Sequence, residues 1–384
     1  MSNRHARELK THDINEVFVK DLQNRESALR ANHVWLAPAL DQFCNGRAIT
    51  PPRNAPAGLT LLERAVLIDE ASYVGIYRMW ARRGRVTFDL NEHMASELYR
   101  SSYDKLPGSI FDRLPYINPL VVLPDPWPVR FGKSEGLVRG FFIHGFNQIP
   151  ERQTYTDEDI EGLGLLFVID LLDEETGDVN YQTYVRLNLP TCLAEFTLSQ
   201  AVEFAAARAE ARWIRSPDKG AVYDMFESML KPALSILVYL CCDNRDVAEP
   251  PVIKPTHKKR AKASLRDRDP FFVEVGWRVG PALHAARRQA GRILDGEGIP
   301  SGFQQAPHQR SGHFKKVRVG RGGADRVTRF VMPYWVRLDL LAEHEDPITT
   351  VVPVDPQRHD ALRRRGLRNA RASGGRDPYA DPSR

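Results

Sequence analysis

The feature that most constrains the fold of this chain is a glycine-rich break in its C-terminal third, with alternating residues on both sides. The break is Arg321-Gly322-Gly323-Ala324, between residues 313–320 and 325–331. Glycine adopts positive φ at little cost, so a glycine-rich gap between two alternating runs predicts a β-hairpin. Any fold for this chain must therefore accommodate an antiparallel strand pair here.

The two faces of the expected hairpin differ, because strand side chains alternate in direction. We expect one face to join a core through four valines: Val317, Val319, Val327 and Val331. The opposite face presents an aromatic ring beside cations: Phe314, Lys316 and Arg318. Such a face suits phosphate binding with stacking of bases or ribose. An edge strand that lysines protect from aggregation has the same pattern, so both interpretations stay open at this point.

Charge is concentrated in the same part of the chain. The net charge of the whole chain is +5. Residues 1–253 hold 27 basic and 35 acidic side chains, a net charge of −8, whereas residues 254–329 hold 18 and 6, a net charge of +12. A concentrated basic field is typical of a protein that binds a polyanion or an acidic partner. Arginine outnumbers lysine 42 to 12, which favours RNA contacts through the planar guanidinium or reflects the composition of the gene.

Length and composition indicate a soluble globular protein of two or three domains, with 384 residues of which 42% are hydrophobic and 27% charged. The longest apolar run, Ala233 to Cys242, is too short to span a bilayer. Residues 1–20 show no signal-peptide pattern. We therefore expect a cytoplasmic protein with no membrane partner. The four cysteines lack the paired spacing of zinc or redox sites, and we interpret Cys241 and Cys242 as structural thiols.

Hydrophobic periodicity predicts an α+β fold, with mixed helices and an antiparallel sheet and a smaller basic C-terminal module. The expected units are a helical N-terminal extension (1–57), an α+β domain (58–248), a basic linker (249–270), a basic strand-helix-hairpin module (271–345) and a disordered tail (346–384).

Within the α+β domain, the expected helices cover residues 60–82, 91–99, 197–213 and 221–242, the last of them kinked or split at Pro232. The expected strands cover residues 86–90, 136–146, 163–172 and 179–189. In the proline-rich stretch 107–128, proline denies a sheet its backbone N–H. Only residues around 120–123 can then form an inner strand, and the rest should wrap a surface.

Several separated pieces of the C-terminal third resemble a known family. They are Leu240 to Val247, the strand end Val275-Gly276, the helix after Gly280, the pattern His308-x-Arg310-x-x-His313 and the closing Val331-Met332-Pro333. Together, over roughly residues 225–335, they are similar to the anti-CRISPR inhibitors of type V-A systems that suppress biogenesis of the effector nuclease, and to uncharacterised plasmid and phage relatives. The resemblance implies control of expression, through recognition of an emerging protein chain and loss of its message. Phe314 stands where the family pattern has tryptophan, and the tail beyond Asp339 is additional.

The first functional hypothesis is an adaptor that binds RNA, or a ribosome-associated nascent chain, through the basic module. Its candidate nucleic-acid contacts are Arg287, Arg288, Arg292, Arg310, Lys315, Lys316, Arg318 and Arg321. Its candidate aromatic contacts are Phe314, Tyr334 and Trp335. Binding through phosphates should weaken strongly as salt rises, because those contacts release counterions.

Two alternatives come from other classes of protein. A metal-independent ribonuclease would use His308 and His313 as acid and base, with Arg310 or Lys315 stabilising the developing charge. A protein-binding module without nucleic-acid contact would use aromatic anchors of the acidic half, such as Trp80, Tyr116 or Trp127. The chain contains no P-loop, dinucleotide fingerprint, zinc-finger spacing or nucleophile elbow, so we expect no cofactor and no metal.

Overall fold

The computed structural model describes residues 10, 12–43, 56, 58–101, 103, 105–116, 118–131, 134–145, 162–173, 175–189, 197–212, 219–247, 269–281, 283–284, 308–310 and 312–336. Most of the expected basic linker and all of the expected tail lie outside these residues.

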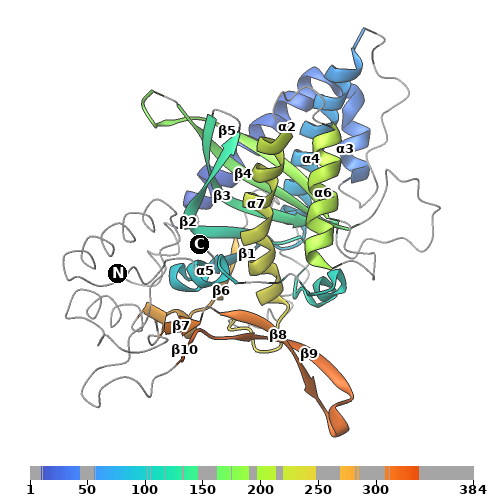
Figure 1. The fold of residues 1–384 in the computed structure, drawn as a ribbon. Coiled ribbons are helices and arrows are strands. Elements are labelled where there is room, and N and C mark those ends of the chain that lie inside the picture. The colour runs from blue at the N-terminus through green and yellow to red at the C-terminus, as the bar shows by residue number, and fades with distance from the viewer. Residues whose placement is uncertain are drawn as a thin grey trace.

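A six-stranded mixed sheet forms the centre of the fold, with the strand order β5-β4-β3-β2-β1-β6 (Figure 1). The strands are β1 (Val86–Leu90), β2 (Leu120–Phe131), β3 (Ser134–His144), β4 (Leu163–Leu172), β5 (Val179–Leu189) and β6 (Phe271–Val275). Strand β1 pairs in parallel with both β2 and β6, and β2 to β5 are antiparallel. The expected α+β class is confirmed, with a mixed rather than purely antiparallel sheet.

Helices cover both faces of this sheet (Figure 1). One face is covered by η1 (Asn15–Val19), α2 (Lys20–Asn32) and α4 (Leu61–Arg82), and the other by α5 (Glu92–Leu98), η3 (Gly108–Arg113), α6 (Leu198–Arg212) and α7 (Lys219–Leu240). Two shorter helices, η2 (Val34–Leu36) and α3 (Ala37–Phe43), pack against α2 and α4. One core lies between the sheet and α5, α6 and α7, and the other lies between the sheet and η1, α2 and α4. Neighbouring residues Phe141 and Phe142 on β3 point into these two different cores. None of the described helices is both long and apolar enough to cross a membrane.

Three helices start at the predicted residues, and a side chain caps each of them. At α4, Thr60 Oγ1 accepts from the backbone N–H of Glu63 (3.2 Å), while Glu63 Oε2 accepts from the backbone N–H of Thr60 (2.8 Å). The same reciprocal pair joins Thr197 and Gln200 at α6. Asn91 caps α5 by accepting from two backbone N–H groups. Each pattern satisfies N–H groups that the first helical turn leaves without partners.

The proline-rich stretch departs from expectation, because β2 continues through three prolines to Phe131. Strand β1 pairs with β2 only from Leu120 to Val122. Beyond that point β2 has β3 as its one described neighbour, and the register shifts between Val122 and Trp127. Prolines are tolerated at such edges and bulges, where no partner strand requires the missing N–H. Helix α7 likewise runs unbroken past Pro232, because the residues that follow it are packed in the core.

The C-terminal third contributes a strand to the central sheet and a ribbon outside it. Strand β6, expected in a separate module, pairs with β1 along its full length, so the central sheet crosses the expected domain boundary. The ribbon consists of β8 (His313–Val319) and β9 (Asp325–Val331), joined through the turn η6 (Arg321–Gly323). The expected hairpin is therefore present, with Gly320, Gly322 and Gly323 at φ of 81°, 71° and 70°. A shorter pair, β7 (His308–Arg310) and β10 (Tyr334–Val336), lies beside its base.

Candidate nucleic-acid interface

The base of the hairpin is fixed in the main core by Phe330, whose side chain is 2% exposed. Its ring meets the ring of Tyr239 from α7 edge-to-face, with centroids 5.4 Å apart, and lies 5.2 Å from the ring of Phe314. Gly312 leaves room for Phe330, since a Cβ at position 312 would lie 2.4 Å from Phe330 Cζ. The hairpin is therefore anchored by aromatic packing at one end.

The connector segment Asp243–Val247, which follows α7, adds polar contacts to this anchor. The Asn244 side chain donates to the carbonyl of Phe330 and accepts from its N–H, both at 2.9 Å. The backbone N–H of Asp243 donates to the carbonyl of Thr328 (3.0 Å), and the Asp243 carboxylate pairs with Arg329 (3.2 Å). The Asn244 side chain thus forms the two backbone hydrogen bonds at Phe330 that a neighbouring strand would otherwise form. Residues named in the family resemblance hold the hairpin against the body.

Asp246, also in the connector segment, holds the residues that follow β6. This carboxylate is 7% exposed and accepts from the backbone N–H groups of Arg278 (2.7 Å) and Val279 (2.9 Å). Its own N–H donates to the hydroxyl of Tyr239 (2.8 Å), and burial raises the pKa of that hydroxyl. A carboxylate at the first N–H groups of a helix is favourable because it satisfies donors that have no partner. Asp246 therefore orients the helix that begins at Val279.

Two glycines of the resemblance allow close approach to α5. A Cβ at Gly276, whose φ is 74°, would lie 2.6 Å from Cβ of Met94. At Gly280 it would lie 2.1 Å from Oδ1 of Asn91. Only glycine fits at these contacts. The family pattern around Val275-Gly276 and Gly280 is thus explained by packing rather than by ligand contact.

Cys241 and Cys242 end α7 as buried thiols, as expected for structural cysteines. Burial raises the pKa of Cys242 to about 12, and the nearby cations Arg245 and Arg113 lower it only in part. Burial raises the pKa of Cys241 as well. A thiol with a raised pKa is a poor nucleophile, which agrees with a packing role.

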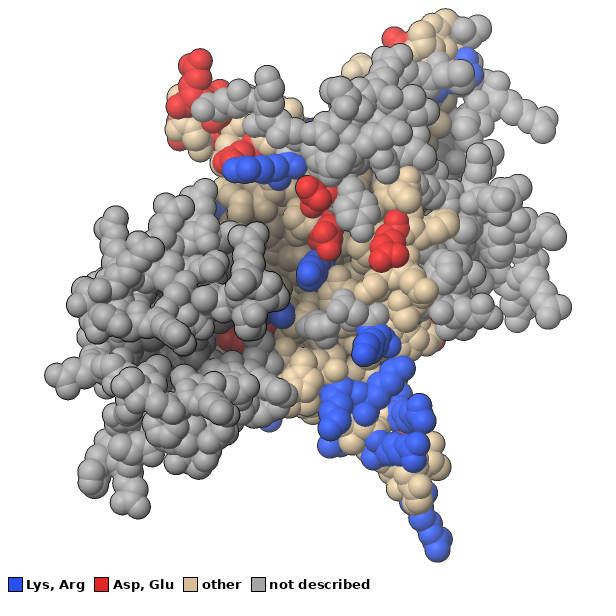
Figure 2. Space-filling view, viewed as in Figure 1, with Lys and Arg blue, Asp and Glu red and all other residues tan. Residues whose placement is uncertain are grey.

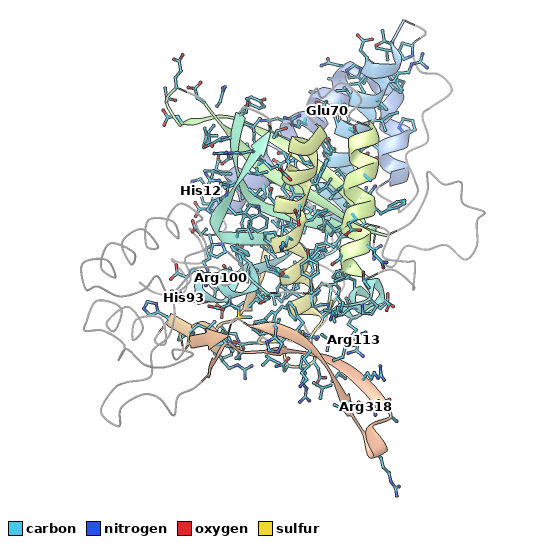
Figure 3. The ribbon with its side chains drawn as sticks, viewed as in Figure 1. His12, Glu70, His93, Arg100, Arg113 and Arg318 are labelled. Carbon is cyan, nitrogen blue, oxygen red and sulfur yellow. The ribbon has the colours of Figure 1, made fainter. Side chains whose placement is uncertain are left out.

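The exposed part of the hairpin is strongly cationic (Figure 2). Its exposed basic residues are Lys315, Lys316, Arg318, Arg321, Arg326 and Arg329. One carboxylate, Asp325, lies among them in the sequence. Arg318 projects from the outer part of the ribbon, away from the sheet (Figure 3). The hairpin therefore presents a dense positive field on a narrow support.

The register of the strands places cations directly opposite cations. Lys315 is opposite Arg329, and Arg318 is opposite Arg326. Like charges directly opposite one another destabilise a strand pair. Asp243 offsets the first pair through Arg329. Among the described residues, no carboxylate forms an ion pair with Arg318 or Arg326, so an external anion would stabilise this pair.

The register puts the four valines on one face of the hairpin and Phe314, Lys316 and Arg318 on the other, as expected. The face that joins the core is the opposite of the expected one, because the core contact at the hairpin base is made by Phe314 and Phe330. Phe314 was expected beside the cations as a stacking surface. It packs against the core instead, because Phe330 draws that face of the ribbon onto Tyr239. Strand alternation also sends Lys315 and Lys316 to opposite faces.

The structure describes only some of the other predicted site residues. Arg287, Arg288 and Arg292 lie outside the described residues, as do the side chains of His308, Arg310, Tyr334 and Trp335. The backbone puts His308 on β7 and His313 on β8, in two different strand pairs. His313 is half-buried opposite Val331. Catalysis by these histidines remains a prediction.

Sequence reasoning missed two members of the cationic surface, Arg326 and Arg329 on β9. Pairing the two alternating runs residue by residue across the glycine turn would have found them, because antiparallel register follows from the turn. The roles of Asn244 and Asp246 were also missed. No local sequence signal indicates them, since their partners lie 86 and 32 residues away along the chain.

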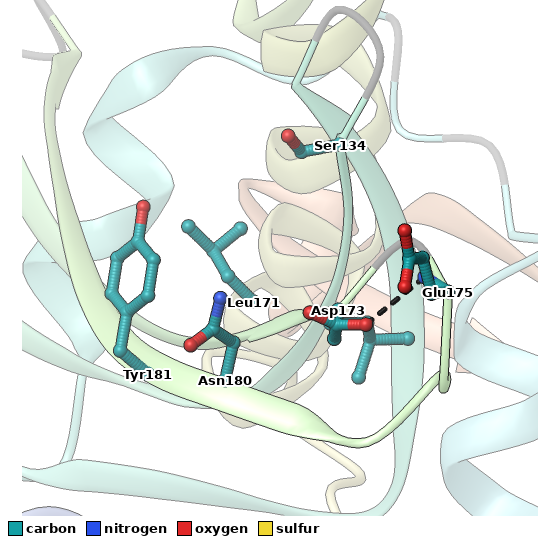
Figure 4. A pocket seen from close by; sticks show the side chains of 7 residues that line it. Ser134, Leu171, Asp173, Glu175, Asn180 and Tyr181 are labelled. Carbon is teal, nitrogen blue, oxygen red and sulfur yellow. Dashed lines mark hydrogen bonds between the residues drawn. The ribbon is translucent and has the colours of Figure 1, made fainter.

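A cavity lies beside β3, β4 and β5 of the central sheet. This cavity has a volume of about 360 Å³ and is lined by Ser134, Leu171, Leu172, Asp173, Glu175, Asn180 and Tyr181 (Figure 4). Asp173 Oδ1 accepts from the backbone N–H groups of Glu175 (3.0 Å) and Thr176 (2.9 Å). Its carboxylate therefore stabilises the β4–β5 turn, and the cavity offers a weaker case for a ligand than the hairpin does.

The chain was compared with known families, solved structures and curated proteins. Residues 88–338 match the model of the anti-CRISPR type V subtype A2 family, described as AcrVA2-like. A solved structure described as the crystal structure of AcrVA2 is similar to this chain with a TM-score of 0.43 and 17% sequence identity, covering 86% of this chain and 98% of the other. A comparison with curated proteins finds no match. Because the matched residues make up more than half of the chain, from within β1 to beyond β10, the protein belongs to the anti-CRISPR type V subtype A2 family.

Proposed function

We propose that this protein acts in the cytoplasm as an anti-CRISPR-like regulator, and that it lowers the expression of a target protein by binding RNA or a translation-associated complex. The hairpin β8–β9 is the contact surface. The observation that carries the proposal is the opposed pair Arg318 and Arg326, which is exposed and has no carboxylate partner among the described residues.

The electrostatics of the hairpin suit a phosphate backbone. Exposed cations that face water gain by releasing the counterions condensed on a nucleic acid, and this gain is independent of base sequence. The anchored base supports the proposal as well, because Phe330 and Asn244 hold the ribbon in one orientation without help from a ligand. A protein partner, the emerging chain that the resemblance implies, is compatible with the same complex.

RNA binding by the full-length chain tests this proposal. Fluorescence anisotropy with a labelled RNA, measured over a series of salt concentrations, should show affinity that falls steeply as salt rises. The variant Lys315→Gln/Lys316→Gln/Arg318→Gln/Arg326→Gln should bind far more weakly. Its salt slope should decrease by about four units, on the order of one for each lost phosphate contact.

The matched control changes four exposed cations on other parts of the molecule: Lys20→Gln, Arg82→Gln, Arg83→Gln and Arg130→Gln. It has the same net charge as the hairpin variant and should bind RNA like the unmodified protein. Equal weakening in both variants would mean that only total charge matters, and RNA binding that does not depend on salt would overturn the proposal.

A further inference from the structure

The outer part of the hairpin has cations on both of its faces. Strand alternation puts Lys315 and Arg329 on one face, and Lys316, Arg318 and Arg326 on the other. All five side chains are exposed. A flat surface for one polyanion strand would need cations on one face only. The arrangement therefore fits a ligand that presents phosphates to two sides of the ribbon at once.

The same region contains no surface for base stacking. Residues 315–329 include no aromatic residue. The two aromatic residues that flank it in the sequence, Phe314 and Phe330, pack against each other and the core. Proteins that bind single strands without sequence preference combine a cationic groove with aromatic rings, and each stacked base contributes about 1–3 kcal/mol. The outer ribbon therefore has the phosphate component of such a site and lacks the stacking component.

Double-stranded RNA presents phosphates on two strands, which are the groups that the cations of the ribbon can contact. Its bases are stacked and paired internally, so a protein reaches it mainly through shape, phosphates and ribose hydroxyls. Its two backbones flank each groove, so a narrow support with cations on both faces can contact both at once. The opposed pair Arg318 and Arg326 and the opposed pair Lys315 and Arg329 then serve different strands.

We infer that the ribbon β8–β9 binds double-stranded RNA, with each face contacting the phosphates of one strand. This inference rests on the proposed function and names its ligand class. It explains why the strands place like charges opposite one another, an arrangement that costs stability in the free protein.

Lys315 and Lys316 provide the test, because they are adjacent, chemically identical and on opposite faces of β8. The full-length protein is titrated into a labelled 20-base-pair RNA duplex and, separately, into each of its strands. At 0.1 M salt, we expect the duplex to bind at least tenfold more tightly than either strand. Lys315→Gln and Lys316→Gln should each weaken duplex binding by about eightfold, the value that one phosphate contact gives at this salt concentration. Both variants should keep the melting temperature of the unmodified protein, because both side chains are exposed.

The outcomes separate this inference from the function on which it rests. Single strands that bind as tightly as the duplex, or weakening by only one of the two lysine variants, would overturn the duplex assignment and leave RNA binding in place. Absence of binding to the duplex and to both strands would overturn the proposed function itself.

Discussion

Two hairpins of this protein are both densely charged and have opposite signs. The β4–β5 hairpin turns through an acidic sequence, Asp173 to Asp178, at the upper left in Figure 1. The β8–β9 hairpin carries the cations and projects at the lower right. Both turn at a glycine with positive φ, and both have seven or more residues in each strand. They differ in what their charges contact.

The acidic turn uses its first carboxylate internally. Two backbone N–H groups and the Thr176 hydroxyl donate to Asp173 Oδ1, and the backbone hydrogen bonds lower the pKa of Asp173. The basic hairpin has internal compensation at Arg329 alone among its described cations, and its base depends on Phe330 and Asn244. Charge density therefore does not distinguish a structural turn from a binding surface. The local partners of each charge do.

The largest expected effect is on the free energy of unfolding, and it tests whether the β8–β9 hairpin is anchored in the core while the β4–β5 hairpin is not. Phe330→Ala should lower the free energy of unfolding by about 3–5 kcal/mol, because it empties a packed site in the core. The control is Tyr181→Ala on β5, where the side chain is 57% exposed, and the change should be within about 0.5 kcal/mol. Urea unfolding followed by circular dichroism measures both. Similar losses in the two variants would show that the hairpins are not anchored differently.

The second effect concerns acid and the sheet that holds the β4–β5 hairpin. His144 on β3 lies over Gly164 of β4, and burial lowers the pKa of its imidazole to about 3. Between this value and the ordinary value near 6.5, the unfolded chain binds a proton that the folded chain excludes, so stability is complete above about pH 6.5 and is lost as the pH falls. Between these two pKa values, the free energy of unfolding should fall by about 1.4 kcal/mol for each unit by which the pH is lowered.

Urea unfolding at pH 7 and pH 5 checks this value. The free energy of unfolding should fall by about 2 kcal/mol more in the unmodified protein than in His144→Leu, which has no titrating group at this position. An equal fall in both proteins would assign the acid sensitivity to other groups.

The smallest effect compares the polar contacts of the two hairpins. Asn244→Ala removes both hydrogen bonds to Phe330 and should lower the free energy of unfolding by about 1–2 kcal/mol. Asp173→Ala should cost less, because its turn is exposed and water can replace the lost acceptor. Hydrogen exchange sharpens the contrast: Asn244→Ala should speed exchange of amides in β9, and Asp173→Ala should affect only the β4–β5 turn. Uniform exchange changes across both hairpins would contradict this prediction.

Much of the fold is predictable from local sequence patterns. The capping residues Thr60, Asn91 and Thr197 fix three helix starts, because each pattern is complete within four residues. The β8–β9 hairpin is predictable for the same reason, since its glycine turn and alternating strands are contiguous.

Most of the missed features depend on distant partners. The pairing of β6 with β1 and the inward position of Phe314 are set by tertiary contacts that a local hydrophobic pattern does not indicate. The second half of β2 pairs with the next strand, and it was missed because its three prolines argued against a strand. The cationic residues and their distribution over two faces follow from strand alternation, whereas the face that joins the core could be seen only in the structure. The hydrogen bonds of Asn244 and Asp246 could be identified only from the structure, because their partners are distant in the sequence.

The parallel pairing of β1 with β6 also has a kinetic consequence. Val86 is paired with Phe271, so this edge of the central sheet joins residues separated by 185 positions. Contacts of such long sequence separation form slowly, because closing the intervening loop costs entropy before the strands interact. During synthesis, β1 remains without this neighbour until most of the chain has left the ribosome. The protein therefore completes its own sheet late, and its edge at β1 is open to other strands while the chain is still being made.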